Sequence, residues 1–302
     1  MEAMNATLKL PIKRLLSPVT LVRRAFSRAE VLMLTSIVKA YRYYKRWGPW
    51  STLTRIVIVL GGKDSYKNYI RSAKRDGAAE VFTGIYHRNI WKNDESASGH
   101  GSTLEYTKNV RAALPLIFEK LEIASIVDAP CGDFNWMRSV PLQGVRYSGI
   151  DIVPSLIDQN NIRYGRSDIC FICADISRTT FPNADLLLCR DCLFHLSFTD
   201  IRGFLQSFSR SKIKYLMTTT HKIPYRFRNY DIITGDFRVI DLFRPPFGFP
   251  RDVAFRVDDY LPPDPPREMC VWSAEQVEAS LILQQAPALG LSDRRLSSDR
   301  DR

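Results

Sequence analysis

The sequence predicts an α/β fold in which a mostly parallel sheet is flanked by helices. An apolar run that ends in Asp128 breaks at once into a turn around Gly132, and a second apolar run ends in Asp151, 23 residues after the first acid. Beyond residue 151, apolar runs alternate with helix-like segments. Strand, glycine turn, helix, strand and acid form the plan by which an open α/β sheet binds a nucleoside-bearing cofactor at its carboxyl edge.

The individual elements follow from this alternation. A helix precedes the first strand, a helix follows the turn at Gly132, and strands and helices then alternate to residue 219. Two later apolar runs are expected to form the antiparallel pair that closes the sheet, with the proline-rich loop 261–266 between them. The strands are expected at 124–128, 145–151, 169–174, 185–190, 213–219, 237–242 and 269–272, and the helices at 103–121, 154–164 and 199–210.

The single glycine of the first turn argues against a dinucleotide. A dinucleotide fingerprint reads G-x-G-x-x-G, which lets backbone amides approach two phosphates at a helix N-terminus. Here Gly132 has Pro130, which lacks an amide, and the acidic Asp133 as neighbours. A cofactor with a cationic centre fits better, because acids near the turn then attract it. S-adenosylmethionine has such a centre, its sulfonium. The alternative is that Asp128 and Asp151 are solvated aspartates that end two ordinary strands.

Residues 85–247 contain a series of short motifs that resemble a known family. The motifs are Ile85-Tyr86-x-x-Asn89-x-Trp91, Ser98-Gly-x-Gly-Ser-Thr-Leu-Glu105, Asp128-Ala-Pro-Cys-Gly-Asp-Phe-Asn-Trp136, Asp151-Ile-Val-Pro154, Cys189-Arg-Asp-Cys-Leu-x-His-Leu-Ser197, Thr218-Thr-Thr220, Asp231-Ile-x-Thr-Gly235 and Pro245-Pro-Phe247. In this order they resemble bacterial class I S-adenosylmethionine-dependent methyltransferases, a family mostly uncharacterised as to substrate. The resemblance implies a Rossmann-like sheet with a C-terminal antiparallel strand, and S-adenosyl-L-methionine as the cofactor. It does not identify the methyl acceptor.

Asp151 is the strongest candidate for the cofactor site. A carboxylate at the end of a buried strand is costly without a polar partner, and ribose hydroxyls supply one. Asp175, after the third strand, is expected either to hold the adenine amino group or to cap a helix. The loop 98–102 is expected to fold over the cofactor or to be an ordinary helix entry. The predicted cofactor-binding residues are Asp128, Cys131, Gly132, Asp151, Ile152, Asp175, Arg190, Ser98 and Gly101.

The acceptor side is predicted at the end of the fourth strand, where an apolar run turns charged at Arg190 and Asp191. Methyl transfer is an in-line displacement at an activated carbon, so positioning can carry most of it. A base is required only when the acceptor must lose a proton early. Asp191, His195 and His221 are the predicted catalytic residues, each a candidate for that base. The alternative for both histidines is a satisfied core residue.

Length and charge predict one catalytic domain with extensions. The chain has 302 residues, 45% of them hydrophobic and 25% charged, as in ordinary globular proteins. Of the net charge of +11, residues 1–50 carry +8, because ten Lys and Arg face only two acids there. The sequence therefore predicts a basic, partly helical extension at 1–78, a cofactor-binding domain at 79–275, and a tail at 276–302 that is disordered at its end.

The extension contains a predicted amphipathic helix at 29–47, whose basic residues Lys39, Arg42 and Arg46 lie opposite a broad apolar face. Such a helix fits peripheral contact with an anionic membrane. Packing of its apolar face on the catalytic domain is the alternative. No apolar stretch reaches the roughly 20 residues that span a bilayer, and no secretory signal is evident. A cytoplasmic protein is expected, either free or peripheral at the inner membrane face.

Two cysteine pairs, Cys170 with Cys173 and Cys189 with Cys192, have a spacing that formally suits zinc. Both pairs lie in or next to apolar runs that read as buried parallel strands. Residues three apart on a strand point to opposite faces, so neither pair offers two converging thiolates. The sequence therefore predicts no metal, and small buried side chains in its place.

Three functions are compatible with these observations. The favoured one is methyl transfer to a small-molecule, glycan or lipid-linked acceptor. Another is an RNA or protein methyltransferase whose basic extension holds the substrate. Against it, residues 51–302 are nearly balanced in charge, with a net +3. The third is a cofactor-binding interaction module without activity, which the intact acids and the charged end of the fourth strand argue against.

Overall fold

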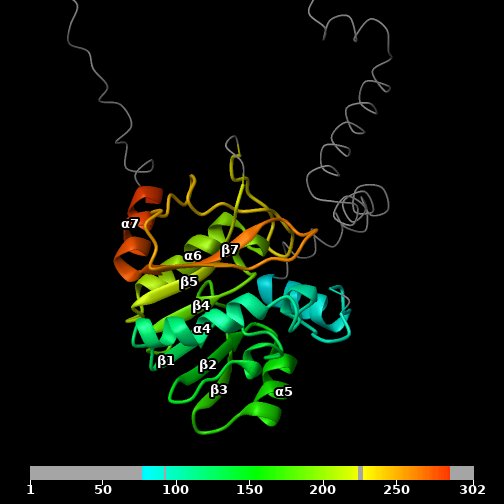
Figure 1. The fold of residues 1–302 in the computed structure, drawn as a ribbon. Helices are drawn as coiled ribbons and strands as arrows, with labels where there is room; N and C mark the ends of the chain where they lie inside the picture. Colours follow the sequence, from blue (N-terminus) through cyan, green and yellow to red (C-terminus); the bar gives the residue numbers. More distant parts are fainter. Residues whose placement is uncertain (1–76, 92, 224–226, 286–302) are drawn as a thin grey trace, which may run out of the picture. The chain divides into compact units, whose positions relative to one another are not determined.

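The computed structural model describes residues 77–91, 93–223 and 227–285. The expected helix at 29–47, and nearly all of the extension predicted at 1–78, lie outside these residues. The described part is built on one seven-stranded sheet in the order β3-β2-β1-β4-β5-β7-β6 (Figure 1). Its strands are β1 (Ser125–Asp128), β2 (Arg146–Asp151), β3 (Ile169–Cys173), β4 (Leu186–Cys189), β5 (Tyr215–His221), β6 (Phe255–Asp258) and β7 (Arg267–Ser273).

The sheet is parallel from β1 to β5, and β7 runs antiparallel to its neighbours β5 and β6. The predicted fold class, a Rossmann-like class I methyltransferase sheet, is confirmed. In the register of the two central pairings, Asp128 lies opposite Gly149 of β2 and Leu188 of β4. The strand order reverses between β1 and β4, which is the place where open α/β sheets bind ligands beyond their carboxyl ends.

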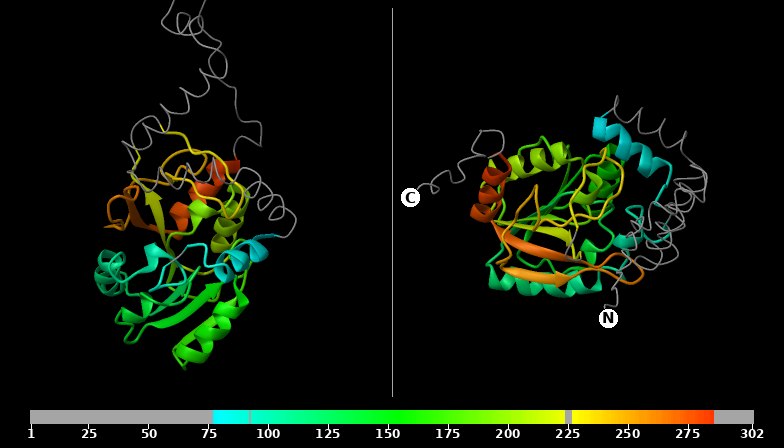
Figure 2. Two further views of the ribbon diagram at one scale, coloured as in Figure 1. Left: turned by 90° about the vertical axis from the view of Figure 1, so that its right-hand side faces the viewer. Right: turned by 90° about the horizontal axis from the view of Figure 1, so that it is seen from above.

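Helices cover both faces of the sheet. Seen from above, α4 lies on one side, and α6 and α7 lie on the other (Figure 2). Side chains alternate along β4, so that Leu186 and Leu188 pack with α4, while Leu187 and Cys189 pack with α6 and α7. The helices are an N-terminal helix at 77–87, α4 (Lys108–Lys120), α5 (Pro154–Tyr164), α6 (Phe198–Ser209) and α7 (Ala274–Gln285), with short 3-10 turns at His100–Ser102, Met137–Ser139 and Leu193–His195.

The prediction of a helix after Gly132 is wrong. Gly132 and Phe134 have φ values of 55° and 58°, which lie in the left-handed region and interrupt any right-handed helix there. Only the 3-10 turn Met137–Ser139 forms before the next strand. The segment instead buries Phe134, Trp136 and Met137 in the core on the α4 side of the sheet.

The prediction of a strand at 237–242 is also wrong. Besides β5, the strand that pairs with β7 is β6, at Phe255–Asp258. Residues 237–242 are an extended coil whose Ile240 and Leu242 are fully buried in the core on the α6 side. The carbonyl of Ile240 accepts a hydrogen bond from the His221 amide at 2.7 Å, the one hydrogen bond between backbone atoms of this segment and of β5 in the described residues. The apolar pattern of this segment reflects core packing without sheet pairing.

The domain boundary predicted after residue 275 falls inside α7. Val277 and Leu281 of this helix are buried in the core, and the Ser280 hydroxyl donates to the Phe247 carbonyl. The structure therefore places residues 276–285 in the folded domain.

The cysteines are divided between two environments. Cys189 and Cys192 are buried, as expected, whereas Cys170 and Cys173 are exposed, because β3 is an edge strand of the sheet. Within the described residues, no three His, Cys, Asp or Glu side chains gather in a group that could hold a metal ion.

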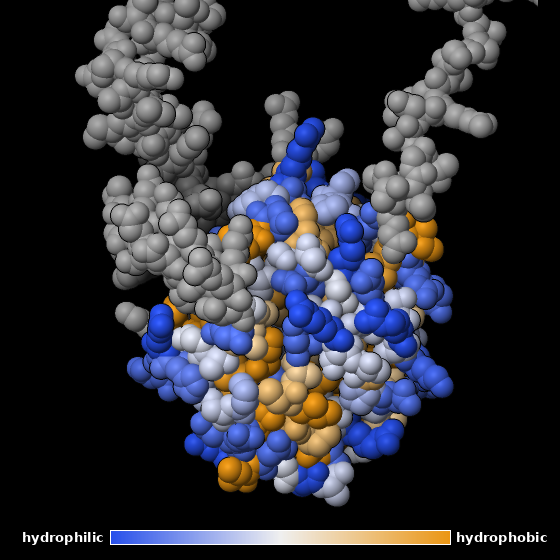
Figure 3. Space-filling model, turned by 180° about the vertical axis from the view of Figure 1, so that it is seen from behind, coloured by the Kyte–Doolittle hydropathy of each residue, from blue (hydrophilic) through white to orange (hydrophobic). Residues whose placement is uncertain are grey.

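The face opposite to that of Figure 1 carries both hydrophilic and hydrophobic side chains. Figure 3 shows small hydrophobic areas separated by hydrophilic side chains on the face seen from behind. None of the helices in the described ranges has the length and apolar character needed to cross a membrane.

Candidate active site

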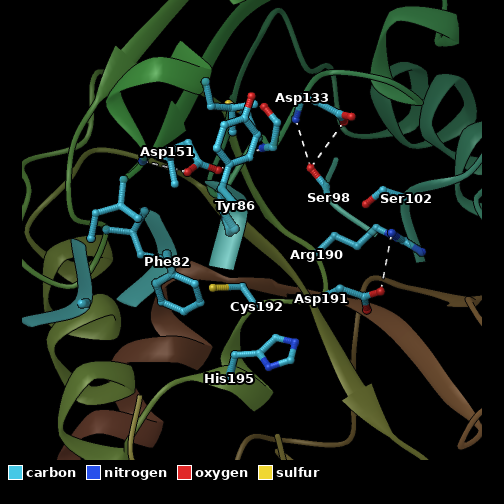
Figure 4. A pocket seen from close by; sticks show the side chains of 18 of the residues that line it. Phe82, Tyr86, Ser98, Ser102, Asp133, Asp151, Arg190, Asp191, Cys192 and His195 are labelled. Atoms are coloured by element: carbon cyan, nitrogen blue, oxygen red, sulfur yellow. Dashed lines mark hydrogen bonds and ion pairs between the residues drawn. The ribbon is translucent and has the colours of Figure 1, made fainter. Parts of the chain in front are cut away.

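A cavity of about 1090 Å³, its open mouth included, lies at the carboxyl ends of the central strands. Figure 4 shows Asp151 and Asp133 in its upper part, His195 below them, and Arg190 and Asp191 at one side. The predicted cofactor and acceptor regions therefore share one cavity.

The turn after β1 forms the floor of the cofactor region. Its Cys131 amide donates to the Ile150 carbonyl of β2, and its Gly132 amide donates to Asp151 Oδ2 at 3.1 Å. The Gly132 carbonyl accepts from the Asn160 side chain of α5. The turn is thus tied to β2 and α5, and Cys131 and Gly132 line the cavity as predicted.

Asp151 lines the cavity at the end of β2 and is only 7% exposed. Its Oδ2 holds the Gly132 amide, and its Oδ1 accepts from the Val153 amide at 3.1 Å. Burial raises the pKa of Asp151, although the hydrogen bonds from Val153 and Gly132 oppose that shift. Each carboxylate oxygen can accept a further hydrogen bond, so Asp151 suits ribose hydroxyls.

Asp128 lies under the turn and does not itself line the cavity. Its Oδ2 accepts from the Tyr147 hydroxyl at 2.7 Å, while its buried Oδ1 has no partner among the described residues. Burial raises the pKa of this carboxyl to about 7. A buried acid with a spare oxygen next to the turn favours a cationic group there and disfavours phosphate.

Asp175 and Ile152 also line the cavity. Asp175 Oδ1 accepts from the amide and the hydroxyl of Ser177 at 2.8 and 2.7 Å, which caps the turn after β3. This is the capping role expected as the alternative for Asp175, although a turn takes the place of a helix. Its Oδ2 lies 3.7 Å from Arg178 Nε.

Asp133 fixes the segment that covers the turn, a role that the sequence did not reveal. Its carboxylate accepts hydrogen bonds from the Ser96 hydroxyl, the Ala97 amide and the Ser98 hydroxyl (Figure 4). Ser98 and Ser102 line the cavity, whereas Gly101 does not. Gly101 instead contributes its carbonyl, which accepts from Arg190 Nη1 at 2.7 Å.

The N-terminal helix at 77–87 supplies an apolar wall that sequence reasoning also missed. Ala78, Phe82 and Tyr86 recur every four residues, so they share one helix face, and all three line the cavity. Trp91 follows on the same wall. The four-residue spacing of these three side chains is the sequence pattern from which this helix face could have been predicted.

Arg190 lines the cavity, but its guanidinium nitrogens are engaged by other residues of the protein. Its Nε and Nη2 donate to the two carboxylate oxygens of Asp259 at 2.8 and 3.0 Å, and its third nitrogen holds Gly101. The guanidinium also lies over the rings of Tyr106 and Trp136. Burial would lower the pKa of Arg190, but the charges of Asp259 and Asp191 outweigh it and raise the pKa.

Asp191 is held by Arg267, which donates from Nε and Nη2 to its two oxygens at 3.0 and 2.7 Å. Burial alone would raise the pKa of Asp191, yet the charges of Arg267 and Arg190 outweigh burial and lower it. Asp191 lines the cavity as an ionised group with a low proton affinity. This makes it a weak candidate for a base.

His195 lies on the 3-10 turn after β4 and lines the cavity. Its Nδ1 is 2.8 Å from the Asp236 carbonyl, which can only accept, so Nδ1 carries the proton and Nε2 has a free lone pair. Burial lowers the pKa of His195. A neutral imidazole with an available Nε2 is suited to accept a proton at neutral pH.

A strap, defined here as residues 234–238, holds the turn that carries His195. The Gly235 amide donates to the His195 carbonyl at 2.8 Å, and the Arg238 amide donates to the Phe194 carbonyl at 3.1 Å. The side chain of Arg238 is fully buried and donates from Nη1 to the Leu196 carbonyl at 2.7 Å. Burial lowers the pKa of Arg238 to about 10.

His221, the third predicted catalytic residue, is not brought to the cavity. It ends β5, is 3% exposed, and accepts at Nδ1 from the Ile240 amide at 3.2 Å. Burial, aided by the charge of Arg267, lowers its pKa to about 3. His221 is the satisfied core histidine that was expected as the alternative.

Gly132 offers a direct test of the cofactor region. A β-carbon at this position would lie 2.2 Å from Ser98 Oγ, so Gly132→Ala is expected to displace the covering segment and abolish measurable binding of S-adenosylhomocysteine. Gly144 also has a positive φ, of 78°, but no atom lies within 4 Å of the site of its β-carbon. Gly144→Ala should therefore lose some stability yet bind S-adenosylhomocysteine normally in calorimetry. Equal binding by both variants would contradict the close contact with Ser98.

Comparisons with known proteins agree with this geometry. A family model described as a methyltransferase domain matches residues 127–214, which run from β1 to the residue before β5. A search of curated proteins finds no match.

Solved structures with similar folds include three methyltransferases. A Burkholderia thailandensis 1,6-didemethyltoxoflavin-N1-methyltransferase is 18% identical, with 70% of this chain and 90% of that chain covered and a TM-score of 0.47. Magnesium protoporphyrin IX methyltransferase from Synechocystis PCC 6803 is 14% identical, with 65% and 99% covered and a TM-score of 0.43. Human N-acetylserotonin methyltransferase is 15% identical, with 70% and 67% covered and a TM-score of 0.42. Because the sequence identities and TM-scores of these three structures are low, the structures carry no argument about the substrate of this chain.

The residues of the cavity fit the predicted cofactor. The turn has one glycine and no free cation for phosphates among the described lining residues, and Asp151, which lines the cavity, suits a ribose. The family model and the class I strand order also support S-adenosylmethionine as the cofactor. Residues 127–214 are a methyltransferase domain in a sheet of the class I order, and the protein is an S-adenosylmethionine-dependent methyltransferase.

Proposed function

We propose that the protein transfers the methyl group to a small-molecule acceptor and that His195 receives the acceptor's proton. The observation that carries the proposal is the position of His195 in the same cavity as Asp151, with its Nδ1 proton held by the Asp236 carbonyl. The glycan and lipid-linked acceptors expected from the sequence stay within this proposal where a small end group enters the cavity.

The residues of this chain would act by binding, enclosure and proton transfer. The bound cofactor supplies a methyl group that is already activated for displacement. Asp151 and the turn at Gly132 orient the nucleoside end, and Phe82 and Tyr86 cover the cavity and exclude water. His195 Nε2 accepts the proton that the acceptor loses. A positioned general base of this kind contributes about 10²–10⁴-fold to rate.

The sequence left open an RNA or protein substrate held by the extension at 1–78, and also docking of that extension on an anionic membrane. Both concern residues that the structure does not describe and stay predictions, as does a cytoplasmic location. Co-sedimentation of the full chain with anionic and neutral vesicles tests the membrane contact. The described cavity gives no support to a phosphate-rich substrate, since its one lining cation, Arg190, is fully engaged.

A transfer survey tests the proposed function. The full chain is incubated with methyl-tritiated S-adenosylmethionine and cell extract, and the label is followed into small-molecule, lipid, glycan, protein and RNA fractions. The label is expected in small molecules or on a small end group. His195→Gln should bind S-adenosylhomocysteine as the parent does, yet transfer about 10²–10⁴-fold more slowly.

The pH dependence of transfer provides a second readout of His195. Because burial lowers the pKa of His195, the rate should fall on the acid side only below the ordinary histidine value of about 6.5.

In the transfer survey, label that is sensitive to ribonuclease or protease would contradict the small-molecule proposal. Binding of S-adenosylhomocysteine without any transfer would favour the non-catalytic module.

A further inference from the structure

We propose that the methyl acceptor is an uncharged molecule with a flat aromatic ring that stacks on Trp91 and presents a hydroxyl or amino group to His195. This inference rests on the proposed function and adds the acceptor's shape and charge. It is carried by the rings around His195 and by the charges that line the cavity.

Trp91 and His195 lie in contact with each other at the acceptor end of the cavity, and the corner that their two rings form is called the slot here. Their ring centroids are 5.9 Å apart with the planes tilted by 36°, and both residues line the cavity. Trp91 is held from below, because Gly99 packs so closely that a β-carbon there would lie 3.0 Å from Trp91 Cβ. Its side chain is still 38% exposed, which leaves part of the indole for a ligand.

The rings behind His195 keep its plane fixed. Phe194 and Phe237 lie with centroids 4.6 and 5.8 Å from the imidazole. With Nδ1 engaged by Asp236, rotation of the imidazole about its side-chain bonds would break a hydrogen bond. The slot therefore presents a fixed indole face and a fixed Nε2, which suits a flat, rigid acceptor better than a flexible chain.

The arginine side chains near this end of the cavity are engaged in hydrogen bonds and ion pairs within the protein. Arg190 has all three nitrogens engaged, and its side chain is 3% exposed. Arg267 is engaged by Asp191 and the Tyr106 hydroxyl. Arg238 donates to main-chain carbonyls, its buried Nε has no partner among the described residues, and it does not line the cavity. Among the described residues that line the cavity, none offers a free positive charge to an anionic acceptor.

The carboxylates of the cavity, by contrast, are mostly uncompensated. Asp133 accepts from Ser96, Ala97 and Ser98 and from the Asn135 amide. Asp151 accepts only from backbone amides, and Asp200 accepts from the hydroxyls of Ser197 and Thr234. These donors are neutral, so the negative charge remains and repels phosphate or carboxylate on the acceptor.

The transfer that this arrangement supports is balanced in atoms and charge. A bond forms between the acceptor oxygen or nitrogen and the methyl carbon while the bond from that carbon to the cofactor sulfur breaks. The sulfur keeps the electron pair and becomes neutral. The proton of the acceptor hydroxyl or amine goes to His195 Nε2 and from there to solvent.

Three matched probes test the shape and charge of the acceptor. The full chain, saturated with S-adenosylhomocysteine, is titrated with 2-naphthol, 2-naphthyl phosphate and decahydro-2-naphthol, and binding is followed by saturation-transfer NMR. The flat neutral probe, 2-naphthol, is expected to bind. The phosphate should bind at least about tenfold more weakly because of like-charge repulsion. The saturated alcohol should also bind more weakly, because it cannot stack.

Variants of Trp91 assign the binding to the slot. Trp91→Ala should weaken 2-naphthol binding by about 5- to 150-fold, the range for loss of one stacking contact, whereas Trp91→Phe should retain most of it. Leu116→Ala is the matched control, since Leu116 is 57% exposed on α4 and does not line the cavity. It should bind 2-naphthol as the parent does.

Each other outcome overturns the inference. Equal or tighter binding of the phosphate removes the charge argument, and equal binding of the saturated alcohol or of Trp91→Ala removes the stacking argument. Failure of all three probes to bind removes both. The affinity for S-adenosylhomocysteine is measured on the same samples, so failure of the cofactor site, which would end the proposed function as well, is recognised separately.

Discussion

Replacing Asp259 by Leu is expected to lower the free energy of unfolding by about 3–5 kcal/mol, the usual cost of leaving one partner of a buried ion pair alone. The Arg190 and Asp259 side chains are only 3% and 0% exposed and are joined by two hydrogen bonds. Without Asp259, the guanidinium keeps the Gly101 carbonyl and a contact of 3.6 Å with Asp191. These are too few for a charge withdrawn from water.

Chemical denaturation with urea measures this loss. The double variant Arg190→Met/Asp259→Leu should be more stable than Asp259→Leu, because it removes the isolated charge and fills the space with apolar side chains. Asp168→Asn, which breaks the exposed pair of Asp168 with Arg166, is the control and should have little effect. If Asp259→Leu is no less stable than this control, the ion pair is not a structural anchor of the site.

Replacing Asp151 by Ala is expected to weaken binding of S-adenosylhomocysteine by about 10- to 150-fold, which corresponds to about 1.5–3 kcal/mol for a lost hydrogen bond to a charged group. Two effects add in the same direction. The ribose loses its acceptor, and the Gly132 and Val153 amides lose the carboxylate that orders the turn.

Isothermal titration of both proteins measures the change. Asp158→Ala is the matched control, because Asp158 is an exposed carboxylate on α5 and does not line the cavity. Asp151→Asn should fall between the two, since its amide retains one oxygen to accept a hydrogen bond. An unchanged affinity in Asp151→Ala would remove Asp151 from the cofactor site.

Local patterns were sufficient for most of the sheet and for the cofactor. The strand that ends in Asp128 is buried along its whole length, the strand that ends in Asp151 is buried from Gly149 onward, and α5 has the limits that the sequence predicts. The two wrong elements have a common cause. Apolar side chains after Gly132 and at 237–242 are buried by distant parts of the chain, and neither a left-handed φ nor core packing of a coil has a local periodicity.

The same limit applies to the site. Asp151, Ile152, Asp175 and His195 follow strand ends and could be located from the strands alone, although their roles stay predictions. Other features are contacts between remote segments: Asp133 with Ser98, the aromatic wall at 77–91, and the enclosure of Arg190 by Asp259. His221 illustrates the opposite error, because a strand end predicted exposure to the cavity while Ile240 covers the residue.

The strap at 234–238 has an evolutionary consequence. Arg238 bonds the carbonyls of Leu193 and Leu196 at once and lies over the Phe198 ring, which the planar guanidinium can do and the ammonium of lysine cannot. A lineage that replaces Arg238 would lose the support of the turn that carries His195. Positions 195 and 238 should therefore change together among homologues, and a descendant that abandons proton transfer should be the first to lose both.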